Sequence, residues 1–136
     1  MPSKRLNWIP VVTGLLRKNG KVLVGQRPNG SNLAGQWEFP GGKIEREESP
    51  EQALARELKE ELGIDADIGA LKFASTHSYG ETGIIILFYE VNFWRGEVKP
   101  VHHMELRWIE PAELINLKIP DANKKILDRL LQILQA

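Results

Sequence analysis

The alternation of apolar and polar positions predicts several strands in the first third of the chain. Residues 8–16 are rich in β-branched and aliphatic side chains, which favours a strand. Asn19-Gly20 is a two-residue hairpin signal, because both residues tolerate a positive φ angle. The elements expected next are a partner strand at residues 21–26, a polar loop at 27–36 and a short strand at 37–39, ended by Pro40-Gly41-Gly42.

The clearest helix prediction covers residues 50–62. Its start, residues 49–52, supplies a serine N-cap, a proline at the first helical position and a glutamine that completes a capping box. Gly63 stands where a C-terminal glycine ends many helices. Leucines recur every four residues and form a stripe that we expect to be buried: Leu54, Leu58 and Leu62.

The second half of the chain predicts further strands and a final helix. Strands are expected at residues 70–78, 83–94 and 105–109, a helical turn at 111–114, and a helix capped by Asp121 that runs to about Leu134. The unbroken apolar run 84–89 indicates a central strand that is covered on both faces. Helices around a mixed sheet predict an α/β fold, an α/β/α sandwich. The apolar side of the final helix either covers the sheet or forms a dimer contact.

Composition narrows the class of protein. The 136 residues, 42% hydrophobic and 26% charged, fit one globular domain of ordinary size. The absence of cysteine excludes a disulfide scaffold, a thiolate metal site and a cysteine nucleophile. The formal net charge of zero is unlike that of a protein that coats a nucleic-acid duplex. No apolar run could span a bilayer and no signal-type stretch opens the chain, so we expect a soluble, cytoplasmic protein.

Acidic residues are concentrated in and before the predicted helix. Residues 45–61 hold seven acids and three bases, a net charge of −4, which leaves +4 for the rest of the chain. Glu57, Glu60 and Glu61 stand at i, i+3 and i+4, so they share one helical face and repel one another. A divalent cation would turn that repulsion into coordination. For this short pattern alone, a solvated helix face is the simpler explanation.

The surrounding sequence reverses that preference. Gly42 is followed after five residues by Glu48, and after seven more by Arg56-Glu57-Leu58-Lys59-Glu60-Glu61-Leu62-Gly63-Ile64. This series resembles the signature of the Nudix hydrolase family at every specified position over 23 residues. The resemblance implies a Nudix fold formed by one domain, residues 1–136, and an enzyme that hydrolyses phosphoric anhydrides.

The resemblance also implies roles for individual residues. The metal ligands it implies are the carbonyl of Gly41 and the carboxylates of Glu57, Glu60 and Glu61, with Mg²⁺ as the ion and Mn²⁺ as a substitute. Glu60 and Glu61 are expected to point outward from the leucine stripe. Glu48 and Arg56 are expected to form an ion pair that fixes the loop against the helix. Lys43 is a candidate contact for a phosphate of the substrate.

Similarity to the MutT-type branch of the family extends over nearly the whole chain. This branch removes oxidised guanine nucleotides, so it implies nucleotide sanitisation, a function in DNA repair, with 8-oxo-dGTP or a similar nucleoside triphosphate as substrate. Asn123 stands where the branch reads the base, and its carboxamide offers the donor and the acceptor that 8-oxoguanine requires. A helix-capping role for Asn123 is the alternative. The other residues implied to bind the substrate are Arg27, Phe39 and Tyr79.

One position departs from the branch and leaves alternatives open. Where MutT-type enzymes carry a late glutamate, this chain has His102, whose neutral imidazole brings no negative charge. Glu105 and Glu81 are further candidates for that catalytic role. An RNA 5′-pyrophosphohydrolase, or an enzyme for modified pyrimidine nucleotides, is therefore an alternative. A non-catalytic nucleotide-binding module is disfavoured by the intact motif, and both a monomer and a homodimer are compatible with the sequence.

Overall fold

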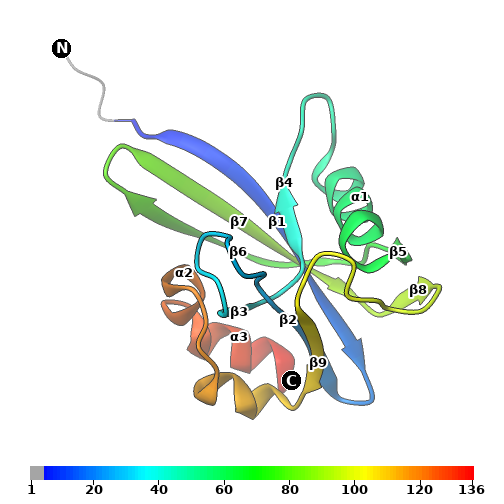
Figure 1. Cartoon of the computed structure of the whole chain (residues 1–136). Helices are drawn as coiled ribbons and strands as arrows, with labels where there is room; N and C mark the ends of the chain where they lie inside the picture. The colour runs from blue at the N-terminus through cyan, green and yellow to red at the C-terminus, as the bar shows by residue number, and fades with distance from the viewer. Residues whose placement is uncertain (1–4) are drawn as a thin grey trace.

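A mixed seven-stranded sheet forms the centre of the molecule (Figure 1). The computed structural model describes residues 5–136. The strands of this sheet are β1 (Asn7–Lys18), β2 (Lys21–Gln26), β3 (Trp37–Glu38), β4 (Gly41–Lys43), β6 (Leu71–Tyr79), β7 (Thr82–Val91) and β9 (Glu105–Ile109). They follow the order β3-β2-β1-β7-β6, while β4 pairs with β1 and β9 pairs with β2. The pairing of β1 with β7 is parallel and the other pairings are antiparallel, which makes the sheet mixed.

Helices cover the sheet on opposite sides, as Figure 1 shows. One side carries α1 (Pro50–Leu62), and the other carries the 3₁₀ segment η1 (Pro111–Asn116), α2 (Asp121–Lys124) and α3 (Leu127–Leu134). A small second sheet pairs β5 (Asp65–Asp67) with β8 (Phe93–Arg95). The predicted α/β sandwich is therefore confirmed. No helix within residues 5–136 has the length and apolar character needed to cross a membrane.

Two hydrophobic cores lie on the two faces of the sheet because successive side chains of a strand point to opposite sides. On β1, Val12 and Leu16 pack with α1, whereas Leu15 packs in the core that α3 covers. The leucine stripe of α1 is completely buried, as the sequence predicts. Leu130 and Leu134 of α3 are buried in the opposite core. The apolar side of the last helix therefore covers the sheet.

Helix α1 begins and ends where its local signals predict. The hydroxyl of Ser49 accepts a hydrogen bond from the backbone N–H of Gln52 at 3.1 Å, and the Gln52 side chain accepts one from the Ser49 N–H at 2.9 Å. Gly63 ends the helix with φ +73°. This is a capping box at one end and a left-handed C-cap at the other.

Three sequence predictions need correction. The prediction of one continuous final helix is wrong. A hydrogen bond from the Ile126 N–H to the Asn123 carbonyl, three residues earlier, ends α2, and Ile126 has non-helical backbone angles before α3 begins. Asp121 is not the cap, since Pro120 holds that position without a side-chain hydrogen bond. Residues 83–94 form two strands, because the chain leaves the main sheet after Val91 and β8 pairs with β5. The short strand β3 ends before Pro40 as predicted, and Gly41 and Gly42 then begin a separate strand, β4, beside β1.

Candidate active site

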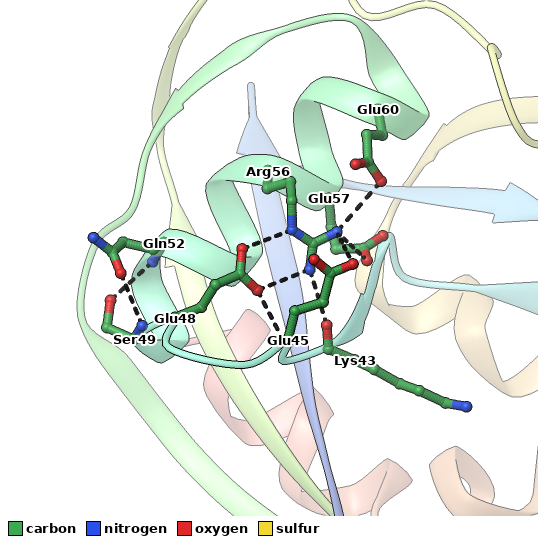
Figure 2. A network of polar contacts seen from close by, with 8 residues as sticks. All are labelled: Lys43, Glu45, Glu48, Ser49, Gln52, Arg56, Glu57 and Glu60. Carbon is green, nitrogen blue, oxygen red and sulfur yellow. Dashed lines mark hydrogen bonds and ion pairs between the residues drawn. The ribbon is translucent and has the colours of Figure 1, made fainter.

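Arg56 is the centre of a polar network that joins α1 to the loop before it (Figure 2). Its Nε and Nη2 donate to the two carboxylate oxygens of Glu48 at 2.7 and 3.0 Å, which gives the predicted ion pair a two-pronged geometry. Its Nη1 lies 2.9 Å from Oε1 of Glu57, and its Nη2 donates to the carbonyl of Lys43 at 3.1 Å. The hydrogen bond from Arg56 lowers the pKa of Glu48, and the bond to Glu48 in turn raises the pKa of Arg56.

Two glycines allow the backbone of β4 to lie close against its neighbours. A Cβ atom on Gly42 would stand 2.4 Å from Cδ of Glu57, so the Glu57 carboxylate lies directly against this glycine. A Cβ atom on Gly41 would stand 2.0 Å from the carbonyl oxygen of Val12 on β1. Any larger residue would displace either the Glu57 carboxylate or the β1–β4 pairing. The two glycines thus allow the Glu57 carboxylate and the backbone of β1 to lie close to β4.

Glu61 differs from its prediction because it is buried rather than directed outward. It stands three residues after Leu58, so it borders the buried stripe and is only 8% exposed. Its Oε1 has no hydrogen-bond partner among the described residues. Burial, followed by the hydrogen bond and negative charge of Glu57 and the charge of Glu38, raises the pKa of Glu61 to about 9. A carboxyl with an unpaired buried oxygen is poorly satisfied without a cation or a proton.

Glu60 keeps the outward position that the sequence predicts. Its side chain is 59% exposed, and its Oε2 lies 3.4 Å from Nη1 of Arg56. Within the described residues, the carboxylates of Glu57, Glu60 and Glu61 do not all come within 4.8 Å of one another. The structure therefore brings Glu57 and Glu61 together. Glu60 lies on the exposed side of α1, near Arg56 (Figure 2).

A pocket of about 300 Å³ opens beside these carboxylates and collects most of the residues predicted for the site. Those that line it are Arg27, Phe39, Gly41, Lys43, Glu61, Tyr79, His102 and Asn123. Gly42 of the motif also lines it, together with residues that sequence reasoning did not propose for the site: Val11, Thr13, Leu33, Glu38, Ile84, Ile86, Pro120 and Ala122. Segments far apart in the chain thus meet in one concave site of the size that small ligands occupy.

Asn123 and Arg27 both line the pocket. The Asn123 carboxamide forms no hydrogen bond with another residue of the range 5–136, and because Pro120 holds the N-cap of α2, the capping alternative is wrong. The guanidinium of Arg27 is held by Glu38 at 2.8 Å and by the Asn32 carbonyl at 2.6 Å. Tyr79 is 55% exposed at the pocket rim. The guanidinium of Arg27, fixed by two hydrogen bonds, and the carboxamide of Asn123, which has none within the described residues, therefore line the same pocket.

Glu105 and Glu81 are not brought to the pocket. Glu105 lies on β9 and pairs with Arg107, and its side chain is about half exposed. Glu81 lies in the turn between β6 and β7. Neither lines the pocket, so His102 is the one of the three late candidates that reaches it.

His103, to which sequence reasoning gave no specific role, contacts two residues that line the pocket. Its ring is fully buried, with Nε2 3.0 Å from Oε2 of Glu38 and 3.8 Å from Oε1 of Glu61. Burial of Glu38 acts to raise its pKa, but the hydrogen bonds from His103 and Arg27 outweigh burial, and the net pKa is lowered. Gly25 gives a signal that was available, because a glycine inside a strand often marks a close approach. A Cβ atom there would stand 2.6 Å from the His103 ring.

Comparison with known proteins identifies the family of the chain and its class of reaction. The model of the NUDIX domain matches residues 11–129. The chain belongs to the Nudix hydrolase family. It is therefore a hydrolase that acts on phosphoric anhydrides.

Several relatives place this Nudix hydrolase in the MutT-like branch. It is 40% identical over 124 residues to the 8-oxo-dGTP diphosphatase of Haemophilus influenzae, covering 90% of this chain and 91% of the relative. It is 36% identical over 130 residues to the CTP pyrophosphohydrolase of Escherichia coli, covering 94% and 95%. The solution structure of the E. coli ORF135 protein is similar with a TM-score of 0.86 and 34% identity, covering 100% of this chain and 96% of that one.

The residues of the Nudix motif fit the divalent cation that the family uses. Glu57 and Glu61 place two acidic groups next to each other, and one buried oxygen of Glu61 lacks a partner. Carbonyl and carboxylate oxygens are the ligands that hard divalent cations prefer. A cation there would neutralise charges that otherwise repel, so the donor set of α1 and β4 suits such an ion.

Proposed function

We propose that this Nudix hydrolase cleaves 8-oxo-dGTP, or a similarly modified nucleoside triphosphate, to the monophosphate and pyrophosphate. One observation carries the proposal. The Asn123 carboxamide has no partner within residues 5–136 and lines the same pocket as Glu61. A group that can read a base and a group that can hold a cation thus stand at two parts of one pocket.

Hydrogen-bond matching supports an oxidised guanine. Guanine presents two acceptors, O6 and N7, on its Hoogsteen edge. In 8-oxoguanine N7 carries a proton, so the edge becomes one acceptor and one donor. The Asn123 carboxamide can pair with both of them. Unmodified guanine offers only acceptors on this edge, so the carboxamide oxygen of Asn123 would be left without a donor. An unpaired polar group in a pocket costs roughly 1–3 kcal/mol, which is enough to favour the oxidised base.

The opposite part of the pocket suits the triphosphate. Glu57 and Glu61, with the Gly41 carbonyl and the exposed Glu60, would hold Mg²⁺, with Mn²⁺ as a substitute. The ion would neutralise phosphate oxygens and so make the phosphoric anhydride open to attack by water. Arg56 keeps Glu57 in place through its bond at 2.9 Å, and Lys43 lines the pocket where it can contact a phosphate. His102 faces the pocket from the late loop and, as a neutral imidazole, can accept a proton.

A substrate panel tests this proposal. The chain is incubated with 8-oxo-dGTP, dGTP, CTP and 5′-triphosphorylated RNA, with and without Mg²⁺, and kcat/KM is measured for each. We expect cation-dependent release of pyrophosphate, with 8-oxo-dGTP preferred over dGTP. A higher kcat/KM for CTP or for RNA would reject the assigned substrate. Tight nucleotide binding without any turnover would instead reject hydrolysis.

A second substrate class has support from one observation. A cavity of about 370 Å³ adjoins the pocket and shares Leu33, Tyr79, Pro120 and Ala122 with it. Gln36 and His77 line this cavity, and each has a buried side-chain atom without a hydrogen-bond partner among the described residues. A second nucleotide could occupy this space, which supports 5′-triphosphorylated RNA as the second candidate substrate.

A further inference from the structure

A second group of metal-ligating side chains lies beside the Nudix motif. It consists of Glu38, His102 and His103, and one ligand atom from each lies within 4.8 Å of those of the other two. Glu38 comes from β3 and the histidines come from the loop before β9, so none of the three belongs to the motif. Two of the three ligands are imidazole nitrogens, whereas α1 supplies carboxylate oxygens. We call these three residues the histidine cluster.

The loop that carries the two histidines is fixed at both ends. The backbone N–H groups of Lys99 and Val101 donate to the carbonyls of Leu62 and Glu61 at 3.0 and 3.2 Å, which satisfies two free carbonyls at the end of α1. The Met104 N–H donates to the carbonyl of Gln26 on β2 at 3.0 Å. The segment between these anchors is therefore held against both α1 and β2. This fixes the backbone that carries the two imidazoles relative to the sheet.

The His103 ring occupies a space that only a glycine leaves open. Its side chain is fully buried, and a Cβ atom on Gly25 would collide with three of its ring atoms at 2.6 to 2.9 Å. The ring therefore packs directly against the backbone of β2 at Gly25. This fixes Nε2 of His103 between the carboxylates of Glu38 and Glu61.

The distances around Nε2 of His103 suit a small tetrahedral ion. Oε2 of Glu38 lies at 3.0 Å, and the unpartnered Oε1 of Glu61 lies at 3.8 Å. Bonds of about 2.0–2.1 Å around a tetrahedral ion separate neighbouring ligand atoms by about 3.3 Å. The two measured separations bracket that value. His102 is exposed, so rotation of its side chain can close the remaining distance.

We propose that Glu38, His102 and His103, together with Oε1 of Glu61, bind a transition-metal ion of the Zn²⁺ class. Imidazole nitrogens favour such ions over Mg²⁺, which prefers oxygen ligands and octahedral geometry. Glu38 and Glu61 bring two carboxylates to the site, and Arg27 already pairs with Glu38, so the site retains unpaired negative character that favours a cation. This site goes beyond the proposed function and shares only Glu61 with the Mg²⁺ position on α1.

Glu61 belongs both to this site and to the proposed Mg²⁺ site, so an ion bound at one should affect the other. An ion in the histidine cluster would draw Oε1 of Glu61 toward His103 and away from Glu57. It would also occupy His102, which otherwise faces the pocket. We therefore expect low concentrations of Zn²⁺ to reduce turnover that depends on Mg²⁺.

Titration of the untagged, EDTA-treated protein with Co²⁺ tests the site directly, without an activity assay. Tetrahedral Co²⁺ absorbs visible light strongly, whereas Co²⁺ at an octahedral oxygen site absorbs weakly. We expect an intense band that saturates at about one ion per chain, that Zn²⁺ removes and that excess Mg²⁺ does not. Weak octahedral bands alone, or displacement by Mg²⁺, would overturn the proposal.

Variants of two histidines and two glutamates locate the ion. His102→Ala should abolish the intense band, and because His102 is exposed this change leaves the buried core intact. Glu38→Gln should also abolish it. His77→Ala, which removes the one histidine outside the cluster, and Glu60→Gln, which alters the motif alone, should keep it. Persistence of the band in His102→Ala, or its loss in His77→Ala, would contradict the assignment.

Discussion

Glu61 combines two properties that conflict in the metal-free protein. It is buried next to Glu57, and its Oε1 has no hydrogen-bond partner in the described part of the chain. Burial and neighbouring negative charge favour the protonated carboxyl, whereas binding a cation requires the carboxylate. The residue therefore costs stability in the free protein and contributes a ligand in the active one, a combination that is common at functional sites.

The raised pKa of Glu61 should make the free energy of unfolding depend on pH. The pKa of Glu61 is raised from 4.5 to about 9 in the folded protein, so the folded chain holds a proton that the unfolded chain has lost between these values. Its contribution to the free energy of unfolding is therefore full below 4.5 and is lost as the pH rises toward about 9. Glu61→Gln should flatten this decline in urea denaturation at about pH 5.5 and about pH 8.5 in EDTA.

Glu60→Gln is the matched control for this measurement, because its side chain is 59% exposed. It should leave the pH dependence of stability unchanged, while both variants lower kcat by about 100-fold or more. An unchanged slope in Glu61→Gln would show that this carboxyl is ionised in the folded protein.

Asn123 sets base selectivity if its carboxamide pairs with the base. Asn123→Ala should lower the preference for 8-oxo-dGTP over dGTP by about 10-fold, because one or two hydrogen bonds are lost, and should change kcat less. A competition assay with both nucleotides measures the ratio. Asn116→Ala, at the exposed end of η1, should leave it unchanged. An unaltered ratio in Asn123→Ala would exclude this residue as the base reader.

At the scale of elements, α1 and the loop before it act as one unit through Arg56. The guanidinium contacts both oxygens of Glu48, the carboxylate of Glu57 and the Lys43 carbonyl. These contacts hold the loop, the helix and β4 in one arrangement (Figure 2). The arrangement depends on the planar fork of arginine as much as on its charge.

Arg56→Lys keeps the positive charge and removes the fork. We expect kcat/KM to fall by about 10- to 100-fold, because Glu57 loses its fixed position, and the free energy of unfolding to fall by about 1 kcal/mol. Steady-state kinetics and urea denaturation measure the two effects. Arg95→Lys, in the exposed pair with Asp67 at 3.6 Å, should change neither quantity. Full activity in Arg56→Lys would mean that charge alone positions Glu57.

Elements governed by local signals could be predicted from the sequence, and those governed by distant contacts could not. The bounds of α1 follow from a capping box, a proline and a C-terminal glycine, all adjacent in the chain. The break between α2 and α3 carries no glycine or proline, and β8 leaves the main sheet to pair with β5. The burial of Glu61 and His103 likewise depends on residues that the chain brings together only when it folds. The Nudix motif revealed the carboxylates but not the buried imidazole.

At the scale of the whole molecule, the site combines residues from elements that pack on the two opposite faces of the sheet. Figure 1 shows α1 on one side of β1 and β4, with α2 and α3 on the other. Glu61 comes from the helix that packs on one core, and Asn123 comes from the segment that packs on the other. The distance between cation ligands and base reader therefore depends on both cores remaining packed.

Leu58 tests how strongly the first core holds α1. Its side chain is 0% exposed, so Leu58→Ala should lower the free energy of unfolding by about 2–5 kcal/mol. Leu71→Ala, at a position that is 51% exposed on β6, should change it by less than about 0.5 kcal/mol. Urea denaturation of both variants gives the comparison. Equal and small effects would contradict the packing of α1 on the sheet.

A crystal structure with Mg²⁺ and a non-hydrolysable analogue of 8-oxo-dGTP tests the central claim most directly. We expect the ion against Glu57 and Glu61, the phosphates beside Gly41 and Lys43, and the base paired with Asn123. An ion bound elsewhere, with the α1 carboxylates facing solvent and the base away from Asn123, would contradict it.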